Sequence, residues 1–286
     1  MGSLTTPLDW TGGPALLWVF AAALLYGLGG RGRRKRPGDA WRTTSFLVGL
    51  AAVVIALDSP IDDLADRLFW VHMVQHILLI GAAAPLLALA RPWTRMWRGL
   101  PLAYRRDLAR ALAGPGGAPL RRAAGLLGGA LASWLLFNLN FCAWHLPVLY
   151  DAALRWEFVH ALEHLTFFAT ALLFWTRVIP AAPWRSSLGD LGKIAYLGST
   201  MVVGWVLAIV LALAASPLYA PYAEAASRPG HISALTDQQL AGGVMWVPGA
   251  LAYLIAIVVI AYRWLEPHES PGAQPARSEA LPRGVG

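Results

Sequence analysis

Two pairs of histidines carry the chemistry that this sequence best supports. His72 and His76 are four residues apart in an apolar run, and His160 and His164 repeat the spacing. On a helix, residues at this spacing share one face, with Cβ atoms about 5–6 Å apart. Imidazole is a ligand for copper, zinc, iron and nickel. Two helices that each present such a pair are therefore able to surround one or two metal ions.

A structural interpretation of the same histidines is also open. Their rings could hydrogen-bond one another or nearby carbonyls and so hold helices together. Ionisable and polar residues inside apolar spans are costly, however, and they mark functional sites. Two pairs at the same depth, with His145 nearby, favour a metal site over this alternative.

His145 belongs to the segment Trp144-His-Leu-Pro147-Val-Leu-Tyr-Asp151, which follows an apolar run. Because Pro147 disrupts a regular helix, His145 is predicted on a short turn or re-entrant element that leans over the helix ends. Cys142 is the single cysteine, so no intrachain disulfide forms. Cys142 lies three residues before His145 and could add a thiolate ligand, but we favour its interpretation as a small buried packing residue.

Acidic residues and one methionine complete the candidate site. Asp58 and Asp62 either accept hydrogen bonds from the second nitrogen of a ligating imidazole or cap a helix that starts at Pro60. Glu163 would orient a ligating imidazole or bridge ligands of the metal site. Met245 is either a soft ligand for Cu(I) or a packing residue. The candidate metal ligands are His72, His76, His145, His160, His164, Asp58, Asp62 and Met245.

Composition identifies the elements that must position these residues. The 286 residues are 57% hydrophobic and 14% charged, whereas soluble domains are about 25% charged. We predict an all-α, polytopic membrane protein whose membrane domain covers residues 1–265 and whose tail, 266–286, is disordered. Seven transmembrane helices are expected, at about 14–29, 43–57, 69–90, 123–141, 158–179, 194–214 and 241–262.

Charge predicts the orientation. Of the 23 Lys and Arg residues, 20 fall in alternate loops and the tail, which are therefore predicted to be cytoplasmic, with the N-terminus outside. The basic residues are explained by topology and contact with membrane lipid, so no nucleic-acid partner is expected. All histidines except His268 then fall in the outer loops or outer halves of spans.

Five motifs along this frame resemble the multi-span assembly factors of caa3-type cytochrome c oxidase, the CtaG-like family. The resemblance covers roughly residues 43–262. The motifs are Asp58-Ser-Pro-Ile-Asp62, His72-Met-Val-Gln-His76 with Ala84-Pro85-Leu-Leu, Trp144-His-Leu-Pro-x-x-Tyr-Asp151, His160-Ala-Leu-Glu-His164-x-Thr-Phe-Phe and Asp237-Gln-Gln-x-Ala-Gly-x-x-Met-Trp246.

This resemblance implies a non-enzymatic factor in a bacterial plasma (inner) membrane. It implies copper as the metal, bound on the outer face and supplied to the oxidase. The expected partners are haem-copper oxidase subunits or a periplasmic copper chaperone. Three other functions are consistent with the residue types: a zinc-dependent intramembrane hydrolase, a membrane protein with a single b-type haem, and a copper transporter. The lack of inner-half histidines disfavours the last two.

Overall fold

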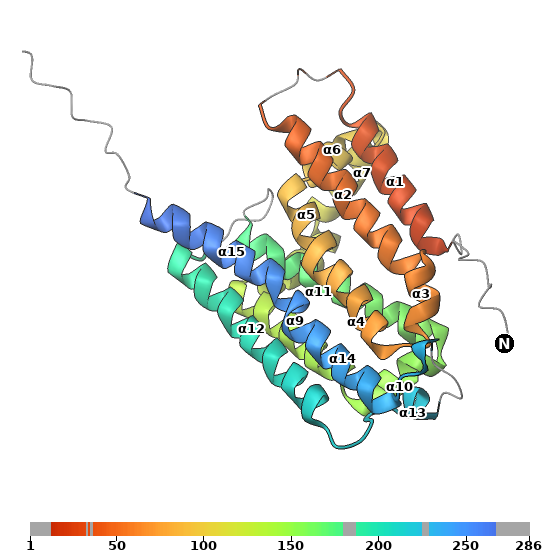
Figure 1. Cartoon of the computed structure of the whole chain (residues 1–286). Helices are drawn as coiled ribbons and strands as arrows, with labels where there is room; N and C mark the ends of the chain where they lie inside the picture. The colour runs from red at the N-terminus through yellow and green to blue at the C-terminus, as the bar shows by residue number, and fades with distance from the viewer. Residues whose placement is uncertain (1–12, 33, 35–36, 180–186, 225–228, 267–286) are drawn as a thin grey trace, which may run out of the picture.

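The structure is a computed structural model that describes residues 13–32, 34, 37–179, 187–224 and 229–266. Within these ranges the chain is helical and contains no strand, which confirms the all-α prediction. Figure 1 shows the helices packed into an elongated bundle. His268 and the tail that was predicted to be disordered lie outside the described residues.

The helices fall into two series along the chain. The first series is α1 (Pro14–Leu28), α2 (Asp39–Leu57), α3 (Pro60–Ala65), α4 (Phe69–Ile77), the π-helical η1 (Leu78–Ala83), α5 (Ala84–Ala90), α6 (Trp93–Gly99), α7 (Leu102–Ala113), η2 (Pro115–Gly117) and α8 (Ala118–Leu127). The second series is α9 (Ala130–Trp144), α10 (Pro147–Arg155), α11 (Glu157–Val178), α12 (Asp190–Leu213), α13 (Ala220–Glu224), η3 (Pro229–His231), α14 (Ala234–Trp246) and α15 (Pro248–Leu265).

Five helices of the described residues are long and apolar enough to cross a membrane. They match five of the seven predicted spans, and they are Asp39–Leu57, Phe69–Ala90, Glu157–Val178, Asp190–Leu213 and Ala234–Leu265. The predicted span 123–141 falls on two helices, Pro115–Leu127 and Ala130–Trp144, which meet at 82° and bring the number to six if they are counted as one span. The predicted span 14–29 is a shorter apolar helix. A membrane protein is thus supported, while seven spans and the orientation stay predictions.

The span that carries the first histidine pair changes its winding directly after His76. In η1 the N–H of Ala84 donates to Leu79, five residues earlier. The next carbonyl in this pattern, that of Ile80, faces Pro85, which has no N–H to donate. Trp175 of α11 supplies the missing donor, with its Nε1–H 2.9 Å from the Ile80 oxygen. The irregular turn therefore joins the third predicted span to α11.

Close packing against α14 holds the other side of the bundle together. A Cβ added at Gly242 would lie 2.8 Å from the carbonyl oxygen of Ala208, so α14 and α12 approach closely only because this residue is glycine. A Cβ added at the adjacent Gly243 would have no atom within 4 Å, so this second glycine is not needed for the close approach. Near one end of the bundle, α4 and α14 run beside the short helices α3, α10 and α13 (Figure 1).

Candidate metal centre

The four histidines of the two predicted pairs come together inside the bundle. The ring centroid of His72, on α4, is 4.5 Å from that of His76. The same centroid is 5.0 Å from that of His160 and 5.7 Å from that of His164, both on α11. The structure thus brings two sequence-distant pairs to the same depth of the fold.

Glu163 lies between the two helices and faces the α4 pair. Its Oε2 is 3.7 Å from Nε2 of His72, and its Oε1 is 3.6 Å from Nε2 of His76. These distances are too long for hydrogen bonds. They are close to the roughly 3.3 Å that separates two ligand atoms of a tetrahedral ion with bonds near 2.05 Å. Glu163 therefore occupies the position of a candidate ligand, in addition to the bridging role that the sequence suggested.

Two groups of three side chains, which share His72, have the spacing of metal ligands. In each group the candidate ligand atoms lie within 4.8 Å of one another. One group is His72, His160 and His164, and the other is His72, His76 and Glu163. We call these five residues the histidine–glutamate cluster. Its imidazole and carboxylate donors suit several divalent transition metals.

The ligand atoms of the cluster have no other use in the fold. Nε2 of all four histidines and both oxygens of Glu163 are buried without a hydrogen-bond partner among the described residues. A buried polar atom left unsatisfied costs about 1–3 kcal/mol. Six such atoms converging on one place fit a bound cation, which would satisfy them together.

The tautomer of His72 is set by Tyr222 of α13. The Tyr222 hydroxyl donates to the carbonyl of Ala65 at 2.6 Å and lies 3.2 Å from Nδ1 of His72. Because the hydroxyl proton is directed to Ala65, the hydroxyl accepts from His72, so Nδ1 carries the proton. Burial raises the pKa of Tyr222 well above its usual value, which keeps the hydroxyl protonated. Nε2 of His72 is left with a free lone pair that faces Glu163, as metal ligation requires.

Asp237 places the start of α4. Its two carboxylate oxygens accept the backbone N–H groups of Phe69 and Trp70, each at 3.0 Å. Asp237 is not the N-cap of its own helix, α14. That role belongs to Ser233, whose hydroxyl accepts the N–H of Thr236 at 3.0 Å. Asp237 is therefore a capping group for the helix that carries His72 and His76.

Asp58 and Asp62 lie outside the two candidate ligand groups. Ser59 caps α3 by accepting the N–H of Ile61 at 3.1 Å, which agrees with the capping interpretation of this segment. Asp62 accepts from Nε2 of Gln75 at 2.6 Å, so it contacts the neighbour of His76 on α4. Asp58 is fully buried, and neither of its oxygens has a hydrogen-bond partner among the described residues. As metal ligands these two aspartates stay predictions.

His145 and Met245 are buried on the side of His76 that faces α9 and α14. The ring centroids of His145 and His76 are 6.5 Å apart, so His145 lies outside the ligand groups of the histidine–glutamate cluster. His145 ends α9 in the turn before Pro147, as predicted, and burial lowers its pKa to about 4. Cys142 is exposed on α9, so the interpretation of it as a buried packing residue is wrong.

A group of stacked aromatic side chains beside the site was not predicted. Tyr150 and Tyr219 stack with centroids 4.1 Å apart, and the edge of Phe69 packs against both. The Tyr219 hydroxyl donates to the carbonyl of His145 at 3.0 Å. For Tyr150, the only indication in the sequence was its place in the motif that runs from Trp144 to Asp151. Nothing in the local sequence marked Tyr219 or Tyr222.

The chain is similar to a known family of proteins. A family model described as cytochrome c oxidase caa3 assembly factor matches residues 10–266. The chain belongs to this family. Membership of the caa3 assembly factor family confirms the resemblance that the five motifs indicated. The family match, residues 10–266, is longer than the stretch 43–262 that the motifs cover.

The curated relatives of this family member come from mycobacteria. Uncharacterized proteins of Mycobacterium bovis and Mycobacterium tuberculosis are each 26% identical over 243 residues, covering 80% of the chain and 35% of their own length. One of Mycobacterium leprae is 25% identical over 262 residues, covering 86% of the chain and 38% of itself. The chain thus spans little more than a third of the length of these relatives. No solved structure matches it.

Proposed function

We propose that the protein is an assembly factor of caa3-type cytochrome c oxidase that binds copper at the histidine–glutamate cluster and delivers it to the oxidase. The observation that carries the proposal is the convergence of six buried, unpartnered ligand atoms from α4 and α11. The family supports the oxidase as the recipient. Copper is the metal because imidazole-rich sites bind it strongly and because the family acts on an oxidase that contains it.

The ligands are suited to holding a metal that must later leave. Four neutral imidazoles and one carboxylate bind copper without the thiolates that would close the site. The only cysteine, Cys142, is exposed on α9 rather than gathered with the histidines. The distribution of basic residues supports a cluster on the outer side of the membrane, and the family supports a bacterial plasma membrane as its location. That position allows exchange with a periplasmic copper chaperone or with oxidase subunits.

Elemental analysis of the protein purified in detergent, without added metal, tests the metal assignment. We expect about one or two copper ions per chain, little zinc, and no haem absorption. The variant H72A/H164A should lose the copper that the cluster holds, which is at least about half of this content. His231 lies outside the cluster, is exposed, and has a φ of 56°. H231N is the matched control because asparagine tolerates that backbone conformation.

Folding of the variants is checked by circular dichroism and size-exclusion chromatography. If H72A/H164A misfolds, E163Q gives the same test, since it removes the anionic ligand at nearly constant volume. Full copper content in a folded cluster variant would place the site elsewhere. Stoichiometric zinc with activity on a lipid amide or ester would replace the proposal with the hydrolase.

Delivery is tested in cells whose own factor has been deleted. Wild-type protein and H231N should restore the copper content of the purified oxidase, and H72A/H164A should not. Equal restoration by all three proteins contradicts copper delivery by this cluster.

A further inference from the structure

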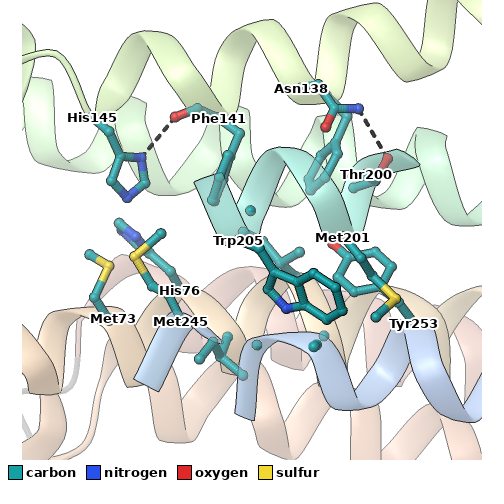
Figure 2. A pocket seen from close by; sticks show the side chains of 17 residues that line it. Met73, His76, Asn138, Phe141, His145, Thr200, Met201, Trp205, Met245 and Tyr253 are labelled. Atoms are coloured by element: carbon teal, nitrogen blue, oxygen red, sulfur yellow. Dashed lines mark hydrogen bonds between the residues drawn. The ribbon is translucent and has the colours of Figure 1, made fainter. Parts of the chain in front are cut away.

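A partly open cavity adjoins the histidine–glutamate cluster on the side of α9, α12 and α14. Its volume is about 60 Å³, several times the 10–15 Å³ that one water requires. Figure 2 shows that its lining is divided between two ends. At one end the side chains of Met73, Met245, His76 and His145 point toward one another. At the other end lie Met201 and Tyr253.

His145 presents an unused lone pair to the methionine end. Its Nδ1 is 2.8 Å from the carbonyl of Phe141, so Nδ1 carries the proton and donates it to that oxygen. Nε2 is then the unprotonated nitrogen, and it is buried without a hydrogen-bond partner among the described residues. A ring whose other nitrogen is held by a backbone carbonyl is oriented as metal-ligating histidines are.

The two methionines supply a different kind of donor. Met73 on α4 is 1% exposed, and Met245 on α14 is 8% exposed. Figure 2 places their sulfur atoms beside the rings of His76 and His145. Thioether sulfur is a soft ligand that selects Cu(I), whereas the neighbouring cluster offers only nitrogen and oxygen. Pure packing would explain the methionines, but not the unsatisfied nitrogen that faces them.

We propose that Met73, Met245 and His145 form a second metal site that is selective for Cu(I). His76 lies between the two sites: its Nε2 faces Glu163 at 3.6 Å, and its ring also borders the cavity. Both of its ring nitrogens lack a hydrogen-bond partner among the described residues. The inference deepens and rests on the proposed function, because it gives copper a soft binding position next to the cluster.

Cu(I) titration against a chromophoric chelator, under anaerobic reducing conditions, tests the site. M73L/M245L conserves volume, which cores tolerate well. We expect this variant to lose at least about tenfold in Cu(I) affinity and to keep its Zn(II) affinity for the cluster. M201L is the matched control, since Met201 lines the same cavity away from the histidines. It should leave both affinities unchanged.

X-ray absorption of the Cu(I)-loaded wild-type protein gives a readout that does not depend on how the variants fold, and the folded variants extend the comparison. Sulfur ligands should appear in the wild type and in M201L and should be absent from M73L/M245L. A wild-type spectrum without sulfur overturns the inference, and so does a folded double variant with wild-type Cu(I) affinity.

The failure of the second site is distinguishable from failure of the proposed function. If H72A/H164A loses copper while M73L/M245L binds Cu(I) normally, copper binding at the cluster is supported and the proposed methionine site is contradicted. If H72A/H164A retains its copper and M73L/M245L loses it, the methionine site is supported and the cluster is not the delivery site. A wild-type protein that binds neither Cu(I) nor Cu(II) overturns both.

Discussion

The carboxylate of Asp237 accepts the backbone N–H of Phe69 at 3.0 Å and so joins α14 to the first residue of α4 across 168 positions of sequence. An anion at this place satisfies amide groups that a helix leaves unpaired at its N-terminus. It also interacts favourably with the helix dipole. The depth and rotation of the helix that carries His72 and His76 are therefore set by a residue near the far end of the chain.

Replacing Asp237 with asparagine should weaken both the fold and the site. Asn keeps one acceptor oxygen but loses the charge and the second acceptor, so we expect a loss of about 1–3 kcal/mol in unfolding free energy. Copper affinity should fall as well, because α4 is no longer held in register with α11. Thermal unfolding in detergent and copper titration measure the two effects. Glu224, exposed at the end of α13, supplies the control E224Q. An unchanged Tm in D237N contradicts the capping role.

Removing the hydroxyl of Tyr222 should weaken metal binding with little change in overall fold. In Y222F, Nδ1 of His72 loses its partner at 3.2 Å, and the tautomer that frees Nε2 is no longer enforced. Loss of a group that orients a ligating histidine typically costs 10–100-fold in metal affinity. Competition titration with copper measures the loss. Y262F is the control, because Tyr262 is exposed on α15. Wild-type affinity in Y222F would show that the hydroxyl does not orient the ring.

The two histidine pairs were predictable because their information is local. The i, i+4 spacing fixes a shared helix face, and the apolar runs around His72 and His160 fix the helices to within a few residues. That α4 and α11 face each other was inferred only from the equal depth of the pairs. The structure supports this pairing, because the ring centroid of His72 on α4 is 5.0 Å from that of His160 and 5.7 Å from that of His164, both on α11.

The features of the site that the sequence did not predict depend on contacts between distant segments. Tyr222 is 150 residues from His72, and no pattern near Tyr222 indicates that its hydroxyl meets an imidazole. Asp237 caps a helix whose first residue lies 168 positions away, whereas capping signals are read locally and identify only Ser233, the N-cap of α14. The 82° bend before α9 follows Gly128 and Gly129, which hydropathy alone treats as part of one apolar run.

Replacing Trp175 with phenylalanine tests the join between α11 and the π-helical turn. W175F leaves the carbonyl of Ile80, which Pro85 cannot satisfy, without its donor at 2.9 Å. The lost hydrogen bond and the smaller ring together should lower the unfolding free energy by about 2 kcal/mol. The exposed Trp264 provides the control W264F. Chemical unfolding in detergent measures the stability of both variants. If W175F is as stable as W264F, the Trp175 hydrogen bond does not stabilise the fold.

The contact between Asp62 and Gln75 predicts how stability depends on pH. The pKa of Asp62 is raised from 3.8 to about 6, and burial is the largest cause. The hydrogen bond from Gln75 opposes this rise, and the charges of Asp66, Asp58 and Asp63 add to it. Because the folded-state pKa is the higher one, the stability that Asp62 contributes is complete below pH 3.8 and is lost as pH rises through 6.

D62N removes this titration while keeping an oxygen that accepts from Gln75. The wild type should therefore lose about 1 kcal/mol relative to D62N between pH 5 and pH 8, a figure that allows for solvent screening of a partly exposed carboxyl. Tm values of both proteins across this range measure the difference. The exposed Glu224, whose charge is not among those that act on Asp62, gives the control E224Q, which should follow the wild type. If the gap between D62N and the wild type narrows as pH rises, the carboxylate is stabilised in the fold and the argument from burial is wrong.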